Sequence, residues 1–228
     1  GLRVDAFALQ RGDVRDLDAV HELHRQHAAR RVLPVDLRHD DFLAAVVKEA
    51  DGWKLGDPFD DATLVGPMNN EPTAQKMDAH LEDALAKGAE IVVGGSRASG
   101  HPTELYYQPT VVDGVGVDTL INRDETFGPI VPLITVADDD EALAVANESH
   151  LGLQAAVYTR SLKRAFRYLD HLQVGNVVVN DSTDYWEAHE PFGGASGTRT
   201  GWGRIGGRYT MLDMTDLKTA VLDVDGLE

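Results

Sequence analysis

Short runs of hydrophobic residues alternate, along this chain of 228 residues, with longer segments in which hydrophobic residues recur every three or four positions. The longer spacing predicts amphipathic helices, and the short continuous runs predict strands. Their alternation is typical of an α/β domain, here a mostly parallel sheet flanked by helices. We predict helices over residues 13–30, 39–53, 71–87 and 139–148, a further helix that begins at Ser161, and strands over residues 91–93, 106–112, 130–136, 153–158 and 177–179.

The predicted helices carry apolar stripes that indicate which surfaces are buried. In the helix over 71–87, Pro72 suits the first turn and Gly88 suits the position just past the end. Five of its residues are expected to face inward: Ala74, Met77, Leu81, Ala84 and Leu85. The helix that begins at Ser161 carries its own apolar set: Leu162, Ala165, Phe166, Leu169 and Leu172.

Two of the predicted strands, 91–93 and 177–179, are entirely apolar. We expect the first to be a short buried strand and the second to lie in a sheet covered on both faces. Residues 181–207 have no such pattern, because 8 of these 27 residues are glycine or proline. Loops of this length inside compact domains are usually functional or disordered. The pattern returns at residues 216–225, where we predict one last strand around 219–222.

The charge of the chain narrows the classes of partner. It has 21 Lys and Arg against 38 Asp and Glu, which gives a formal net charge of -17. A charge of this sign repels phosphate backbones and anionic lipids, so we expect no nucleic-acid partner and no membrane partner. The sequence also has no apolar run long enough to span a bilayer and no basic-then-apolar signal pattern at its start. A cytoplasmic location is therefore the expectation.

The sequence contains no cysteine, which excludes disulfides, thiolate metal ligands and a cysteine nucleophile within it. His21, His24 and His27 recur every third residue of the predicted helix over 13–30 and are the strongest candidates for metal ligands. No carboxylate lies at a spacing that would complete such a site. A solvated polar face is the alternative interpretation, and we predict no metal site.

Three stretches of sequence together resemble one known family. They are Asp-Glu-Thr-Phe-Gly-Pro at 124–129, Gly-Asn-Val-Val-Val-Asn at 175–180, and Pro-Phe-Gly-Gly at 191–194 followed by Gly-Trp-Gly-Arg at 201–204. Each motif alone is weak, but in this order they resemble the carboxyl-terminal half of aldehyde dehydrogenases over about residues 31–225. The segment 201–207 is similar to the branch that acts on aromatic aldehydes, the benzaldehyde, salicylaldehyde and vanillin dehydrogenases.

The resemblance implies an organisation for the chain. Residues 23–215 would form an aldehyde-dehydrogenase-like catalytic domain, residues 216–228 its oligomerisation strand and tail, and residues 1–22 stay unassigned. In the family that strand pairs with a neighbouring subunit, so we expect a homo-oligomer. The family's Rossmann domain normally precedes this portion, and no Gly-x-Gly-x-x-Gly follows a predicted strand here. A separate Rossmann-domain chain is therefore a possible partner.

The family's catalytic cysteine has a counterpart position in this chain. The family pattern Gly-Gln-x-Cys-x-Ala-x-x-Arg aligns with residues 23–31, where Ala28 and Arg31 match and Gln26 occupies the cysteine position. A glutamine amide cannot form the thiohemiacetal through which aldehyde oxidation proceeds. Removal of a protease nucleophile costs a rate factor on the order of 10⁶. We therefore assign no catalytic residue and expect the chain to be inactive alone.

The resemblance assigns further residues to binding. Glu125 would accept hydrogen bonds from the nicotinamide ribose of NAD or NADP, and Phe127 would pack near the nicotinamide ring. Phe192 would form an aromatic wall of the aldehyde funnel, with Trp186 or Tyr185 as another wall. The alternatives are a solvated acidic loop residue for Glu125 and ordinary packing for the aromatic side chains.

Three hypotheses for function remain open. The chain is a truncated or degenerate relative of the aldehyde dehydrogenases, or one subunit of a two-chain oxidoreductase whose partner supplies both the cofactor domain and the nucleophile. The third hypothesis is a non-catalytic module that uses the fold for assembly or scaffolding. Whether the chain is an enzyme is left undecided by the sequence.

Overall fold

The computed structural model of the chain describes residues 7–9, 33–34, 39–181, 183 and 187–223. The predicted helix over 13–30 lies outside these residues. The elements, in chain order, are β1 (Phe7–Leu9), β2 (Leu33–Pro34), α2 (His39–Asp51), α3 (Glu71–Ala86), β3 (Glu90–Val93), β4 (Thr110–Asp113), α4 (Leu120–Arg123), β5 (Ile130–Pro132), α5 (Asp139–Asn147), β6 (Gln154–Tyr158), α6 (Leu162–His171), β7 (Asn176–Val179) and α7 (Gly207–Asp213).

The strands form two sheets, and nearly all of their pairings are parallel. Four strands in the order β2-β1-β6-β7 are parallel throughout. Three strands in the order β3-β4-β5 combine one antiparallel pair, β3 with β4, and one parallel pair, β4 with β5. The predicted α/β class with mostly parallel pairing is confirmed, although the expected single sheet is divided in two.

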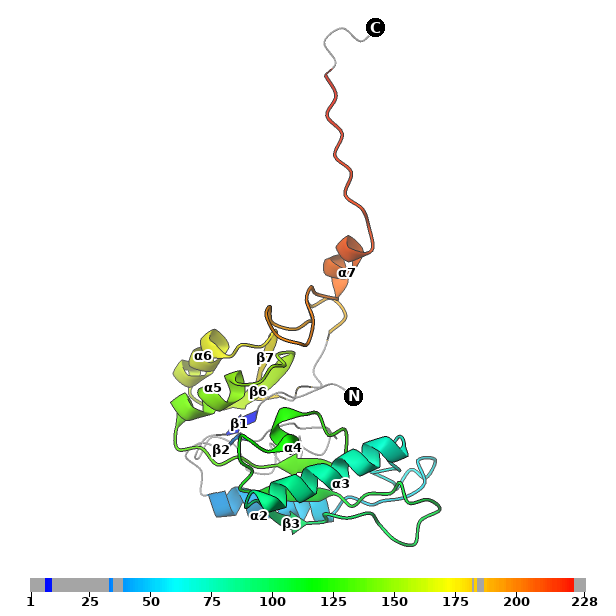
Figure 1. Cartoon of the computed structure of the whole chain (residues 1–228). Helices are drawn as coiled ribbons and strands as arrows, with labels where there is room; N and C mark the ends of the chain where they lie inside the picture. The colour runs from blue at the N-terminus through cyan, green and yellow to red at the C-terminus, as the bar shows by residue number, and fades with distance from the viewer. Residues whose placement is uncertain (1–6, 10–32, 35–38, 182, 184–186, 224–228) are drawn as a thin grey trace.

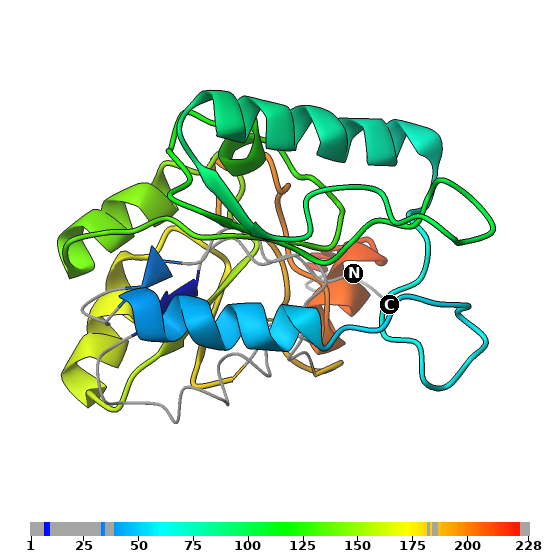
Figure 2. The same ribbon diagram turned by 90° about the horizontal axis from the view of Figure 1, so that it is seen from below.

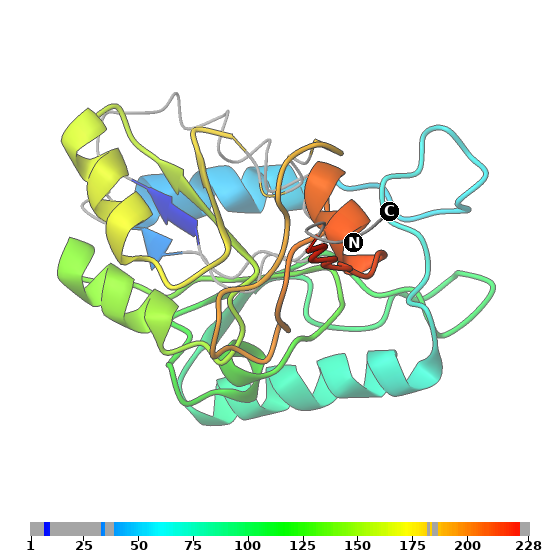
Figure 3. The same ribbon diagram turned by 90° about the horizontal axis from the view of Figure 1, so that it is seen from above.

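Successive side chains of the strands enter two different cores, because strand residues alternate between faces. Val111 and Ala156 pack in a cluster with residues of α2, whereas Val112 and Ala155 belong to a second cluster with residues of α3, α5 and α6. Figures 2 and 3 show α2 and α3 on opposite sides of the sheet layer. Helices therefore cover both faces of the layer.

The predicted helix starts are confirmed by side-chain caps, which satisfy amide groups that the first turn leaves unpaired. The Thr73 amide donates to the Asn70 side chain at 2.9 Å, before α3. Asp138 caps α5 and Ser161 caps α6 in the same way. Gly88, past the end of α3, has φ +92, a conformation that favours glycine.

Two predicted burial patterns are wrong, because each strand lies at the edge of its sheet. β3 alternates between exposed and half-buried residues, and the side chain of Val92 is 37% exposed. β7 is half-buried along its whole length rather than covered on both faces. An apolar run therefore predicted the strands correctly but not their position in the sheets.

The helices also bury fewer apolar residues than their patterns predict. In α6 the buried residues are Ala165 and Tyr168, whereas Leu162, Phe166 and Leu169 are exposed. In α3, Leu85 is exposed, which contradicts the inward orientation expected for it. None of the helices in the described part of the chain is long and apolar enough to cross a membrane.

The carboxyl-terminal part departs from the prediction most clearly. Residues 216–223 are assigned no strand and run as an extended segment away from the rest of the fold (Figure 1). Leu217, Val221 and Leu222 on this segment are each at least 76% exposed. The predicted last strand therefore does not form over these residues in the single chain.

Candidate functional site

The segment 124–129, which carries the predicted cofactor-binding residues, is held against α3. The Nζ of Lys76 donates a hydrogen bond to the backbone carbonyl of Glu125. One turn further along the same helix, Nδ1 of His80 lies 2.9 Å from Oγ1 of Thr126. Residues four apart share one face of a helix, so α3 contacts two successive residues of the loop.

The backbone of this loop has an unusual course at Phe127 and Gly128. Phe127 has φ +58, in the left-handed region that is unfavourable for residues other than glycine by roughly 1–2 kcal/mol. A Cβ atom placed on Gly128 would lie 2.4 Å from Sδ of Met77, so only glycine fits there without movement of the methionine. The next residue accepts a hydrogen bond from Thr110 of β4 through its carbonyl, at 2.8 Å. The loop is therefore fixed between α3 and the sheet.

His80 is a buried titratable group in this site, with its side chain only 3% exposed. Burial lowers the pKa of His80, and the positive charge of Lys76 lowers it further, while Asp124 and Asp83 act in the opposite direction. His80 is therefore neutral near pH 7. A neutral imidazole can act as donor or acceptor toward the Thr126 hydroxyl.

The two predicted cofactor-binding residues are accessible on this anchored loop. Glu125 is half-buried, and Phe127 is 52% exposed. A carboxylate accepts hydrogen bonds from hydroxyl groups, and an aromatic ring two residues away offers a flat apolar surface. The chemistry of this pair suits a ribose and the planar ring attached to it.

The glycine-rich segment, residues 191–207, is built on close contacts between backbones. Phe192 and Ile205 exchange two backbone hydrogen bonds of 2.8 Å each. A Cβ atom placed on Gly175 would lie 1.6 Å from the Gly193 carbonyl oxygen, and one placed on Gly193 would lie 2.5 Å from that of Gly203. Glycine at these positions allows three segments of backbone to stack.

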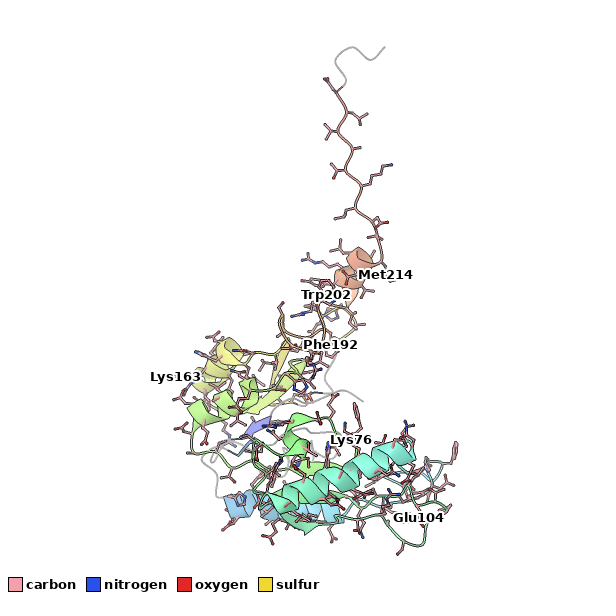
Figure 4. The ribbon with its side chains drawn as sticks, in the orientation of Figure 1. Lys76, Glu104, Lys163, Phe192, Trp202 and Met214 are labelled. Carbon is pink, nitrogen blue, oxygen red and sulfur yellow. The ribbon has the colours of Figure 1, made fainter. Side chains whose placement is uncertain are left out.

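Arg204 donates hydrogen bonds to backbone carbonyls of this glycine-rich segment. Its Nη1 donates to the carbonyl oxygens of Gly194 and Gly203, at 2.6 and 2.8 Å. Beside it lies an open hollow of about 230 Å³ lined by Phe192, Trp202 and Asp213, among others. Figure 4 shows Phe192 and Trp202 toward the α7 end of the fold, whereas Lys76 projects from α3. Phe192 therefore lines this hollow, and its role as a wall of an aldehyde funnel stays a prediction.

The motif at 175–180 ends in a residue with a structural role. Asn180 has φ +58, and its side-chain amide pairs with both backbone polar groups of Thr159. The Thr159 amide donates to Oδ1 at 2.7 Å, and Nδ2 donates to the Thr159 carbonyl at 2.8 Å. Asn tolerates this conformation better than most residues, so Asn180 turns the chain out of β7.

Several predicted site residues lie outside the described residues: Gln26, Trp186, Tyr185 and the three histidines His21, His24 and His27. Sequence reasoning missed Lys76, His80 and Arg204. The signal for His80 was available, since a histidine occupies an inward position of the apolar stripe of α3 and needs a polar partner. Arg204 belongs to the recognised motif at 201–204, but no local pattern indicated its role, because its partners are backbone carbonyls.

Comparison with known proteins agrees with the resemblance of the sequence motifs. A family model described as the aldehyde dehydrogenase family matches residues 26–220. The mitochondrial succinate-semialdehyde dehydrogenase of Arabidopsis thaliana is 36% identical over 194 residues, which are 85% of this chain and 36% of that protein. The succinate-semialdehyde dehydrogenase [NADP(+)] of Deinococcus radiodurans is 38% identical over 191 residues, 84% of this chain and 39% of that protein.

A solved structure is similar over almost the whole chain. The crystal structure of aldehyde dehydrogenase 21 from Physcomitrella patens, in complex with the reaction product succinate, has a TM-score of 0.86 at 28% sequence identity. The match covers 99% of this chain and 47% of that one. The chain therefore spans between a third and a half of the length of the relatives that it matches.

Proposed function

The chain belongs to the aldehyde dehydrogenase family, and from this premise we propose that its residues 23–215 are a portion of the catalytic domain that does not oxidise aldehydes by itself. One observation carries the proposal: the sequence contains no cysteine. By the motif alignment, Gln26 would occupy the position of the family's nucleophile. The family match covers residues 26–220, so Gln26 is its first residue.

The chemistry explains why this one residue is decisive. A cysteine thiolate adds to the aldehyde carbon, and the adduct then loses hydride to leave an acyl thioester that water hydrolyses. The lone pair of a glutamine amide nitrogen is delocalised into its carbonyl, so Gln26 cannot make that bond. The loss is on the order of 10⁶-fold, by analogy with the removal of a protease nucleophile.

We propose that the loop at 124–128 retains part of a site for NAD or NADP. Glu125 would bind the hydroxyls of the nicotinamide ribose, and Phe127 would pack beside the nicotinamide. A bound dinucleotide would serve as the hydride acceptor of the reaction. Each charge-assisted hydrogen bond contributes roughly 1.5–3 kcal/mol, so this loop supports weak affinity at most. A Rossmann domain would supply further affinity for the dinucleotide.

Phe192 and Trp186 would line the entry for an aldehyde. Two of the relatives are succinate-semialdehyde dehydrogenases, which makes succinic semialdehyde the first aldehyde to try. The likeness of residues 201–207 to the aromatic-aldehyde branch makes benzaldehyde the second. Both aldehydes have to be offered with each dinucleotide.

Assembly is a second candidate function, and a specific observation favours it. The extended segment 216–223 exposes Leu217, Val221 and Leu222, and β7 is an edge strand of the four-stranded sheet among the described residues. Strand edges and apolar extended segments are suited to pairing with another chain. We propose that a second copy of the chain receives this segment.

The decisive experiment compares the natural chain with Gln26→Cys. Each is incubated with NAD or NADP and either aldehyde, and reduced cofactor is followed by its absorbance. We expect no turnover from the natural chain, and no acyl adduct on it by mass spectrometry. Turnover or an adduct on the natural chain would overturn the proposal. A thiol-reactive dye confirms that the introduced cysteine is accessible. Turnover by the natural chain with an added partner chain that supplies both a Rossmann domain and a cysteine tests the two-chain alternative.

A further inference from the structure

We propose that His80 is a positioning residue, whose hydrogen bond to Thr126 holds the neighbouring Glu125 in place for the ribose of a dinucleotide. The inference rests on the cofactor role proposed above for Glu125. His80 lies on α3, outside the recognised motifs. The inference also gives a chemical reason why this residue is a histidine.

The first step of the argument is the geometry of the anchor. His80 and Thr126 are 46 residues apart in sequence and 2.9 Å apart at their polar atoms. Both are buried, with 3% and 7% of their surface exposed. A buried hydrogen bond of this kind is costly to break, because each group then loses its partner without gaining water. The contact therefore fixes the residue that directly follows Glu125.

The second step concerns the backbone on either side of Thr126. Lys76 binds the carbonyl of Glu125, and Met77 leaves no room for a side chain on Gly128. Between these contacts Phe127 holds φ +58, which persists only where surrounding contacts impose it. His80 lies in the middle of this set of contacts. Without it, the loop loses the one side-chain hydrogen bond between α3 and Thr126.

The third step is the charge on His80. A proton on the imidazole would place a positive charge in a buried site, close to the ammonium group of Lys76. Asp83 on α3 and Asp124 at the end of α4 face the same imidazole and partly offset that charge. Burial is the largest effect on the pKa of His80 and lowers it, so the neutral form prevails until the pH is acidic. Protonation would add a second positive charge beside Lys76 in this buried site, and so would disfavour the packed arrangement that holds Glu125.

The test measures dinucleotide binding and loop order separately. Thr126→Val removes the hydroxyl at nearly constant shape, and Thr126→Ser is the matched control that keeps it. His80→Gln keeps a neutral hydrogen-bonding group at every pH. Binding of NAD and of NADP is measured by calorimetry over the pH range of histidine titration, and amide hydrogen exchange is measured for residues 125–128 on the same chains without dinucleotide.

We expect Thr126→Val to weaken dinucleotide binding about threefold to tenfold and to speed amide exchange by a similar factor, whereas Thr126→Ser changes neither. The natural chain loses affinity as the pH falls through the titration of His80, and His80→Gln removes that dependence. If the variants change only the melting temperature, with affinity and its pH profile unaltered, His80 has a purely structural role and the inference is wrong.

The two proposals fail in different ways. If neither dinucleotide binds the natural chain while amide exchange responds to Thr126→Val, the cofactor role of Glu125 fails, and the positioning role fails with it although the anchor exists. If a dinucleotide binds, but neither amide exchange nor affinity changes in Thr126→Val or His80→Gln, only the role of His80 is overturned.

Discussion

Nε2 of His39, the first residue of α2, lies 2.8 Å from Oδ1 of Asp113, the last residue of β4. The contact joins a helix to the middle strand of the three-stranded sheet across 74 residues of sequence. The hydrogen bond to Asp113 is the main reason that the pKa of His39 is raised, with burial opposing it and Asp40 adding to it.

The raised pKa of His39 predicts a stability that declines as the pH rises. The folded chain holds a proton that the unfolded chain releases near the ordinary value of 6.5, so the contribution is complete below 6.5 and is lost as the pH rises through the folded pKa. Because the pair is partly exposed, the effect is at most about 1 kcal/mol. In urea unfolding across this pH range, His39→Gln should abolish this pH-dependent contribution to the free energy of unfolding. Asp40→Asn, at a fully exposed position, should leave most of the contribution in place.

His80 should act on stability in the opposite direction. Its pKa is lowered in the folded chain, so between the ordinary value of 6.5 and the folded value the unfolded chain binds a proton that the folded chain does not. Stability is therefore complete above 6.5 and falls as the pH drops below it. In the same urea series His80→Gln should flatten the acidic side of the curve. An unchanged acidic slope would contradict the burial assigned to His80.

The close approach of Gly175 and Gly193 predicts a severe effect of one added methyl group. In Gly175→Ala the new Cβ would overlap the Gly193 carbonyl oxygen, so a backbone has to move, and we expect a loss of about 3 kcal/mol or more. Gly52→Ala is the milder comparison, because a Cβ there would lie 3.3 Å from its nearest neighbour, a carbonyl oxygen, and needs only a small shift. Thermal unfolding of the two variants should differ clearly. Equal melting temperatures of the two variants would contradict the close approach of Gly175 to the Gly193 carbonyl.

The two apolar sides of α6 should respond differently to truncation. Tyr168 is 2% exposed and donates a hydrogen bond to Asp139, so Tyr168→Ala should cost about 3–5 kcal/mol. Phe166 is 55% exposed, and Phe166→Ala should change the free energy of unfolding by about 0.5 kcal/mol or less. Denaturant unfolding measures both. A large loss for Phe166→Ala would mean that its ring is covered in solution by something other than this chain.

Local rules predicted the elements of this fold better than their burial. Asn70, Asp138 and Ser161 begin their helices because capping depends on a few adjacent residues. Burial depends on which strand lies at a sheet edge, and that is decided by distant segments. This is why the apolar runs in β3 and β7 were expected to be more buried than they are.

The candidate site likewise combines features that adjacent residues indicate with contacts that depend on distant segments. Motif resemblance indicated Glu125 and Phe127 from a contiguous stretch of sequence. The contacts of Lys76 and His80 with that stretch join residues 49 and 46 positions apart, and no local pattern contains them. The expected strand at the carboxyl end is a related case, because its expected pairing partner was a second chain, and residues 216–223 form no strand in one chain.

The exposed carboxyl-terminal segment predicts self-association that depends on its apolar side chains. Replacing Leu217, Val221 and Leu222 together by serine should shift the chain toward monomer in light scattering coupled to sizing, because these side chains would be buried only between copies. They are exposed in the single chain, so unfolding of the monomer should change by about 0.5 kcal/mol or less. Lys218→Ser, on the same segment, is the control and should leave the oligomeric state unchanged. A natural chain that is already monomeric at high concentration would rule out this segment as an assembly element.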